Sequence, residues 1–213
     1  MKIKPAQIAS FLRQPDSAVR AILVYGPDGG LVRERTEILA RNVLGEDLSD
    51  PFRCTALYGE TLANDSARLA DEAAALSLIG GSRVVFIRKA VDSLTPVFKS
   101  FFSDPVGESL ILVEAEELSA RSSLRKAFED SSLAAALPCY GDEGPGLSSV
   151  IEAILRDHGV SVSREALAYL SSSLGSDRSV TRAELIKLAL YVADEGTVTL
   201  DDAIACTADS SVL

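Results

Sequence analysis

The chain has 213 residues, 47% of them hydrophobic and 24% charged, a balance typical of folded domains rather than of disordered chains. Its apolar runs are far shorter than the roughly 20 residues of a membrane span, and the formal net charge of −10 disfavours independent binding to nucleic acid, which needs clustered Lys and Arg. Three scattered cysteines and one histidine argue against a disulfide framework and a Cys/His metal site, so we expect a cytoplasmic protein without a bound metal.

Short apolar runs alternate with amphipathic segments in the first part of the sequence. The predicted strands are 21–25, 52–57, 83–88, 109–113 and 134–140, and the predicted helices between them are 31–44, 65–79, 90–102 (interrupted by Pro96) and 122–129. The run Ala21–Tyr25 is continuous, as expected of a strand buried on both faces. The alternation predicts an α/β fold, with a parallel sheet flanked by helices on both faces.

The pattern changes at residues 140–146, YGDEGPG, whose turn-forming residues predict a domain boundary. Beyond it only helices are predicted, at 147–158, 163–174, 179–193 and from 199 onward. We therefore expect an α/β domain over residues 1–140 and a small all-helical domain over residues 141–213. No stop signal accompanies the end of the sequence, which indicates a piece of a longer chain.

A glycine-containing turn follows the first predicted strand, where phosphate-binding loops occur in α/β folds. Gly26, Gly29 and Gly30 lie in this turn, but the phosphate loop GxxxxGK[ST] requires Gly-Lys-Ser/Thr where residues 31–33 are LVR. The loop therefore lacks the lysine for the phosphates and the hydroxyl for magnesium. We predict a degenerate phosphate loop without a bound cofactor, in which Gly29 or Gly30 serves a structural turn with a positive φ.

Glu114 follows the fourth predicted strand, at the position where P-loop ATPases hold a metal ion. Ala115 then stands where a second acid would orient the attacking water. We expect Glu114 to be a solvated acid at a strand end, and we predict no catalytic residues.

The predicted helix 65–79 departs from regular amphipathic spacing near its end. Leu69, Ala73 and Leu76 form a core-facing stripe, whereas Leu78 points about 180° away from Leu69 and Ile79 lies roughly 80° off the stripe. Two interpretations remain open. Either the helix frays and both side chains enter the core, or they form an exposed apolar plug for the pocket of a partner.

Three blocks of sequence resemble the delta-subunit family of the bacterial DNA polymerase III clamp loader. They are LVYGPDGGLVRER at 23–35, LSLIGGSRVV at 76–85 and VTLDDA at 198–203. The resemblance implies an AAA+ fold that has lost ATP binding, with an α/β domain followed by a helical lid. The family's helical collar domain, which joins the subunits, would be missing from this sequence.

The resemblance also implies a function, the opening of a ring-shaped sliding clamp by an apolar wedge at a helix end. The corresponding clamp-binding positions are Leu76, Leu78 and Ile79. Expected partners are the sliding clamp (the beta subunit), other loader subunits through the missing C-terminal domain, and primed DNA only within the assembly. Such a subunit is not catalytic by itself and counts as DNA-directed DNA polymerase only within the holoenzyme.

Two alternatives to the clamp-opening role stay open. One is a nucleotide- or small-molecule-binding enzyme on a doubly wound sheet. The other is an inactive AAA+ adaptor of a different complex.

Overall fold

The computed structural model describes residues 1–78, 80–140, 145–174, 178–193 and 196–207. Contacts divide the chain into two compact units, the first comprising Met1–Pro27 and Val32–Cys139 and the second Asp28–Leu31 and Tyr140–Leu213. Within the described ranges, no helix has both the length and the hydropathy needed to cross a membrane.

A five-stranded parallel sheet forms the centre of the first unit, with the order β2-β3-β4-β1-β5. The strands are β1 (Ala21–Tyr25), β2 (Cys54–Tyr58), β3 (Val84–Arg88), β4 (Leu110–Ala115) and β5 (Ala134–Pro138). In β1, which lies between β4 and β5, Leu23 is opposite Val113 of β4 and Ala136 of β5. The predicted parallel sheet is confirmed, and β1 and β5 are buried along their whole length because helices cover both faces of the sheet.

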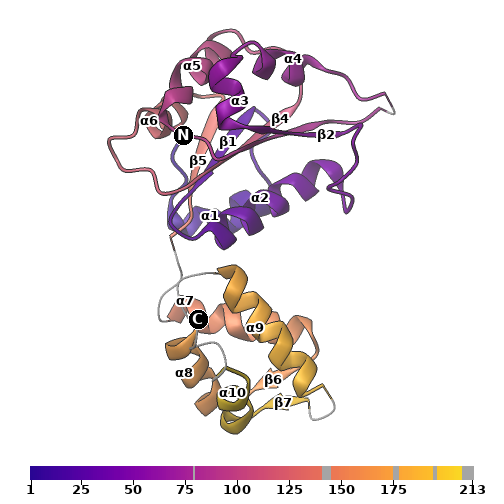
Figure 1. Ribbon diagram of the computed structural model, residues 1–213, viewed down its shortest axis with the longest axis vertical. Helices are drawn as coiled ribbons and strands as arrows, with labels where there is room; N and C mark the ends of the chain where they lie inside the picture. Colours follow the sequence, from indigo (N-terminus) through magenta and orange to yellow (C-terminus); the bar gives the residue numbers. More distant parts are fainter. Residues whose placement is uncertain (79, 141–144, 175–177, 194–195, 208–213) are drawn as a thin grey trace. The chain divides into compact units, whose positions relative to one another are not determined.

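Helices cover the two faces of the sheet unequally (Figure 1). On one face lie α3 (Gly59–Asn64), α4 (Arg68–Ala74), α5 (Thr95–Ser103) and α6 (Ser123–Asp130), and on the other lie α1 (Ile8–Arg13) and α2 (Gly29–Leu44). Two short 3-10 helices, η1 (Pro5–Gln7) and η2 (Asp92–Leu94), precede α1 and α5. Aromatic rings fill the core beneath α5 and α6, where Phe98 and Phe128 meet edge to face with centroids 4.8 Å apart.

Several helices differ from the predicted ones. Pro96 does not interrupt a helix: it lies in the first turn of α5, where its missing N–H costs no hydrogen bond. The helices α1 and α3 were not predicted from the sequence, because each is six residues long and too short for a clear periodic signal. The predicted helix 65–79 is also wrong at its C-terminal end, because α4 stops at Ala74.

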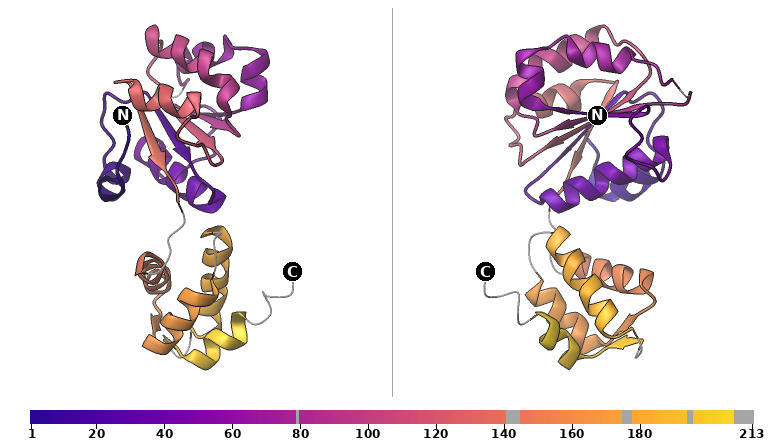
Figure 2. Two further views of the ribbon diagram at one scale, coloured as in Figure 1. Left: turned by 90° about the vertical axis from the view of Figure 1, so that its left-hand side faces the viewer. Right: turned by 45° about the vertical axis from the view of Figure 1, so that its right-hand side comes forward.

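The second unit contains α7 (Pro145–Asp157), α8 (Arg164–Ser173), α9 (Arg178–Tyr191) and α10 (Leu200–Thr207), visible in two orientations in Figure 2. Ser163 caps α8 by accepting the Ala166 N–H at 3.2 Å. Thr199 and Asp202 cap α10 reciprocally, since each side chain accepts the backbone N–H of the other. The unit is mainly helical, but the prediction that it contains only helices is wrong, because β6 (Ser161–Val162) and β7 (Thr197–Val198) form a small parallel sheet.

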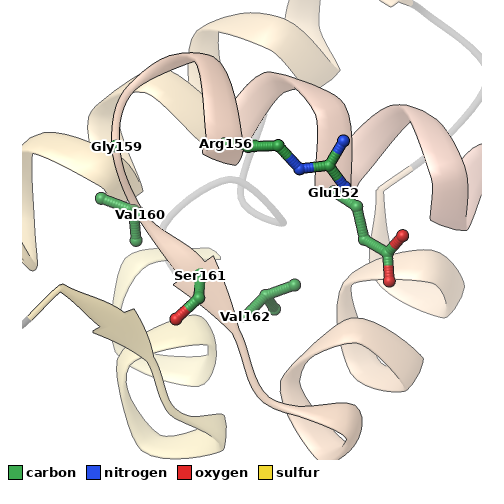
Figure 3. Close-up of a pocket in the computed structure, with 6 residues that line it drawn as sticks. All are labelled: Glu152, Arg156, Gly159, Val160, Ser161 and Val162. Carbon is green, nitrogen blue, oxygen red and sulfur yellow. The ribbon is translucent and has the colours of Figure 1, made fainter.

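One pocket of the second unit lies where α7 turns into β6 (Figure 3). Its polar side chains are those of Glu152, Arg156 and Ser161, and Gly159, with a φ of +76°, makes the turn between the two elements. In the described ranges of the chain, no group of three or more His, Cys, Asp or Glu residues could hold a metal ion.

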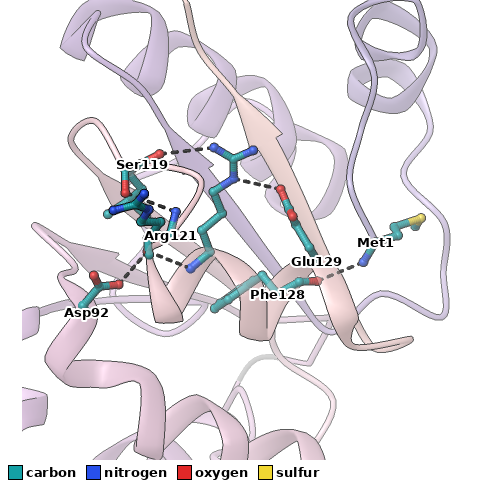
Figure 4. A network of polar contacts seen from close by, with 9 residues as sticks. Met1, Asp92, Ser119, Arg121, Phe128 and Glu129 are labelled. Atoms are coloured by element: carbon teal, nitrogen blue, oxygen red, sulfur yellow. Dashed lines mark hydrogen bonds and ion pairs between the residues drawn. The ribbon is translucent and has the colours of Figure 1, made fainter.

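A polar network surrounds α6 in the first unit (Figure 4). At its start the Asp92 carboxylate accepts the Ser122 hydroxyl at 2.5 Å and the Leu124 N–H at 3.0 Å. These hydrogen bonds, that of Ser122 foremost, lower the pKa of Asp92 below its ordinary value. At the other end, the Met1 ammonium donates to the Phe128 carbonyl at 2.9 Å. The chain terminus and η2 are thus both connected to α6.

Candidate functional site

The segment between α4 and β3, residues 75–82, carries the predicted partner-binding residues. Leu69 and Ala73 of α4 are buried as predicted, but Leu76 is 87% exposed, so its predicted place on the core stripe is wrong. The physical reason is the backbone of Ala75, which is extended (φ −62°, ψ 135°) and takes the chain off the helix axis. The periodicity of α4 therefore does not continue into the segment.

Leu76 and Leu78 have the most exposed large hydrophobic side chains in the described part of the chain, at 87% and 86%. The interpretation that Leu78 enters the core is wrong, while Ile79 lies outside the described residues. Leaving a leucine side chain in water rather than burying it costs about 1.5–3 kcal/mol. Leu76 and Leu78, which are separated by one residue, thus form an exposed apolar feature at the end of α4, of the kind often found where proteins contact partners.

Arg83 anchors the helix that precedes the segment. Its guanidinium is nearly buried and donates to the Glu72 carbonyl at 3.4 Å and the Thr55 hydroxyl at 3.3 Å. The same group lies 3.5 Å from the Glu72 carboxylate. Arg83 is the last residue before β3, so these contacts fix α4 to the edge of the sheet formed by β2 and β3.

Arg53 anchors the end of the segment. Its guanidinium donates to the carbonyl oxygens of Val43, Leu44 and Ser82. The chain reaches Ser82 through Gly80 and Gly81, which have φ values of +80° and +83°. Glycine adopts this backbone conformation without the strain that a Cβ would bring. Neither Arg53 nor Arg83 was identified from the sequence, where an isolated arginine carries no pattern that points to a carbonyl far along the chain.

The predicted phosphate loop has a structural explanation at Gly26. A Cβ on Gly26 would lie 1.8 Å from the Cys139 carbonyl oxygen, so the close approach of the chain beyond β1 and β5 requires glycine. The predicted positive φ at Gly29 or Gly30 is wrong, because both belong to the first turn of α2 and neither has a positive φ.

An acidic side chain takes the place that a phosphate would need at the start of α2. The Asp28 carboxylate accepts the Leu31 N–H at 2.9 Å, which satisfies one of the donors that a helix N-terminus offers to an anion. Glu114 was predicted to be solvated, and this prediction is wrong: its side chain is 13% exposed and forms an ion pair with Arg88. The carboxylates of Asp28 and Glu114 thus both have partners within the chain.

Comparison with known proteins identifies a relative. No protein-family model matches the sequence. The chain is 23% identical over 183 residues to the probable DNA polymerase III subunit delta of Rickettsia prowazekii (strain Madrid E), a match that covers 86% of this chain and 54% of that protein. This chain is a homologue of the DNA polymerase III delta subunit. It spans about half the length of that relative.

Solved structures show that the delta-subunit homologue has an AAA+ fold. The Bacillus subtilis DNA clamp loader delta protein (YqeN) superposes with a TM-score of 0.62 at 18% identity, covering 92% of this chain and 60% of that one. The Thermotoga maritima RuvB Holliday junction branch migration motor superposes with a TM-score of 0.60 at 16% identity, covering 97% and 70%. Domain III of the T. maritima replication initiation protein DnaA gives 0.56 at 15% identity, covering 97% and 93%.

Proposed function

We propose that this chain is the clamp-opening subunit of a DNA polymerase III clamp loader and binds the sliding clamp through Leu76, Leu78 and Ile79. The observation that carries the proposal is the exposure of Leu76 and Leu78, at 87% and 86%, on a segment with both ends anchored. The delta-subunit homology supports the choice of partner. The complementary surface would be an apolar pocket on the clamp.

Burial of the two leucines would supply the binding energy. At about 1.5–3 kcal/mol for each side chain, burial of both contributes roughly 3–6 kcal/mol. Binding can favour an open clamp only by the amount by which the segment binds the open form more tightly than the closed form. A segment anchored to the sheet can favour the open clamp, because it cannot change its conformation to fit the closed clamp as a flexible loop would.

The remaining features of the proposal concern the assembly. Residues 1–140 would form the AAA+ domain that carries the clamp-binding segment, and residues 141–213 the helical lid. Other loader subunits would join this one through a C-terminal domain, supply ATP and contact primed DNA together with it in the cytoplasm. The subunit itself would not hydrolyse ATP, which agrees with the missing phosphate-loop lysine and with the Asp28 cap on α2.

Calorimetric titration of the purified chain with the sliding clamp of the same organism tests the proposal. The double variant Leu76→Ala/Leu78→Ala should bind roughly a hundredfold more weakly, since about 3 kcal/mol of burial is lost. Its melting temperature should stay close to that of the wild type, because neither side chain contributes to the core. Leu190→Ala is the matched control: Leu190 of α9 is 71% exposed but lies outside the segment, so clamp affinity should not change. Failure of the wild type to bind the clamp would refute the proposal.

A further inference from the structure

We infer that Arg53 is a positioning residue for clamp binding, which holds the segment 75–82 in the orientation that presents Leu78. The inference rests on the proposed function. Arg53 Nη2 donates to the Val43 carbonyl at 2.7 Å, Nη1 to the Leu44 carbonyl at 3.1 Å and Nε to the Ser82 carbonyl at 3.2 Å. One side chain thus joins the end of α2 to the end of the segment.

The end of α2 suits a guanidinium. The last carbonyl groups of a helix have no partner within the helix and carry the negative end of its dipole. Val43 and Leu44 provide two of these carbonyls, and the planar fork of Arg53 donates to both while a third nitrogen remains for Ser82. A lysine has one ammonium group and cannot span three acceptors in this fixed geometry.

Gly81 brings the segment against the guanidinium. A Cβ on Gly81 would lie 3.3 Å from Arg53 Nε, slightly closer than an ordinary van der Waals contact, and 3.4 Å from Cζ. The φ of Gly81 is +83°, a conformation that favours glycine. The backbone at Gly81 therefore rests on the guanidinium, only three residues after Leu78.

The backbone of Arg53 is itself fixed by the sheet. Its carbonyl accepts the Val84 N–H at 2.9 Å, next to the pairing of Cys54 with Val84 that begins β2 and β3. The guanidinium thus fixes the segment relative to the sheet and to α2. Less conformational freedom then has to be lost when the clamp binds, which raises affinity without any contact between Arg53 and the clamp.

A double-mutant cycle on clamp affinity tests this role. Arg53→Lys should weaken clamp binding by about tenfold. When Leu78→Ala is already present, the same change should cost about twofold or less, because Arg53 acts through the position of Leu78. Arg35→Lys is the matched control, since Arg35 also donates to a backbone carbonyl, but that of Pro138 at the end of β5, the strand at the opposite edge of the sheet from β2. It should leave clamp affinity unchanged.

A second readout separates positioning from a general loss of stability. Amide hydrogen exchange in Arg53→Lys should accelerate in residues 75–82, while the amides of β1 and β4 keep their protection. Gly81→Ala should reproduce both effects from the other side of the contact. The inference alone would be overturned if the wild type binds the clamp and Arg53→Lys leaves that affinity unchanged. The same holds if Arg53→Lys weakens clamp binding equally in the presence and absence of the Leu78 side chain. A wild type that does not bind the clamp would overturn the proposed function as well.

Discussion

Gly107 lies so close to the end of α4 that a methyl group on it would fall 1.9 Å from the carbonyl oxygen of Ala73. Its φ of +63° is also one that favours glycine. The loop before β4 therefore lies directly against the last turn of α4, next to the point where the chain leaves the helix for the exposed leucines. The position of that helix end depends on a residue more than thirty places further along the chain.

Gly107→Ala should destabilise the protein by about 3 kcal/mol or more, because a steric clash adds to the backbone strain. Gly45→Ala is the matched control in the same unit: its φ is +77°, but a Cβ there would have no atom within 4 Å. This control should lose only about 1–2 kcal/mol, the cost of the backbone conformation. Urea unfolding of the two variants measures the difference, and equal losses would contradict the proposed contact.

Leu69→Ala and Leu76→Ala should have opposite effects on stability and on clamp binding. Leu69 is 1% exposed, so its truncation should cost about 2–5 kcal/mol of unfolding free energy. Leu76 is 87% exposed, and its truncation should change stability by less than about 0.5 kcal/mol while weakening clamp binding. Thermal denaturation and clamp titration of both variants provide the comparison. A large fall in melting temperature for Leu76→Ala would show that this side chain is buried in solution.

Asp92→Asn should lower stability at neutral pH but not in acid. The hydrogen bonds from Ser122 and Leu124 favour the carboxylate and depress the pKa of Asp92 in the folded state. The charged form thus contributes stability above the unfolded pKa of about 4, and this contribution is lost as pH falls through the folded pKa. We expect a deficit of about 1 kcal/mol or less between pH 5 and 7, since Asp92 is exposed. It should shrink below pH 4 in urea unfolding curves, and a deficit that grows on acidification would contradict this assignment.

Calorimetric titration with Mg-ATP should show no saturable binding. Leu31 and Val32 replace the Gly-Lys pair of a phosphate loop, and the Asp28 carboxylate already accepts the Leu31 N–H. Bringing phosphate there would place negative charge next to that carboxylate. Micromolar, magnesium-dependent binding would instead favour the nucleotide-enzyme alternative.

The sequence by itself determined the main features of the first unit. Continuous apolar runs such as Ala21–Tyr25 predicted strands buried on both faces, and the alternation with helical segments predicted the parallel sheet. In the second unit, the predicted helix starts near Ser163 and Thr199 also agree with the structure, where both residues cap helices. These features follow from local patterns, because the periodicity of burial and the capping of helices depend on residues that are close together in the sequence.

Only the tertiary structure decided how the leucines of the candidate site are presented. The regular spacing of Leu69, Ala73 and Leu76 predicted a longer helix, but α4 ends at Ala74 and leaves Leu76 in water. What holds the segment there is Arg53 at one end and Arg83 at the other, through carbonyl groups and side chains of other elements. Such contacts have no periodicity, because they join residues that only the folded chain brings together.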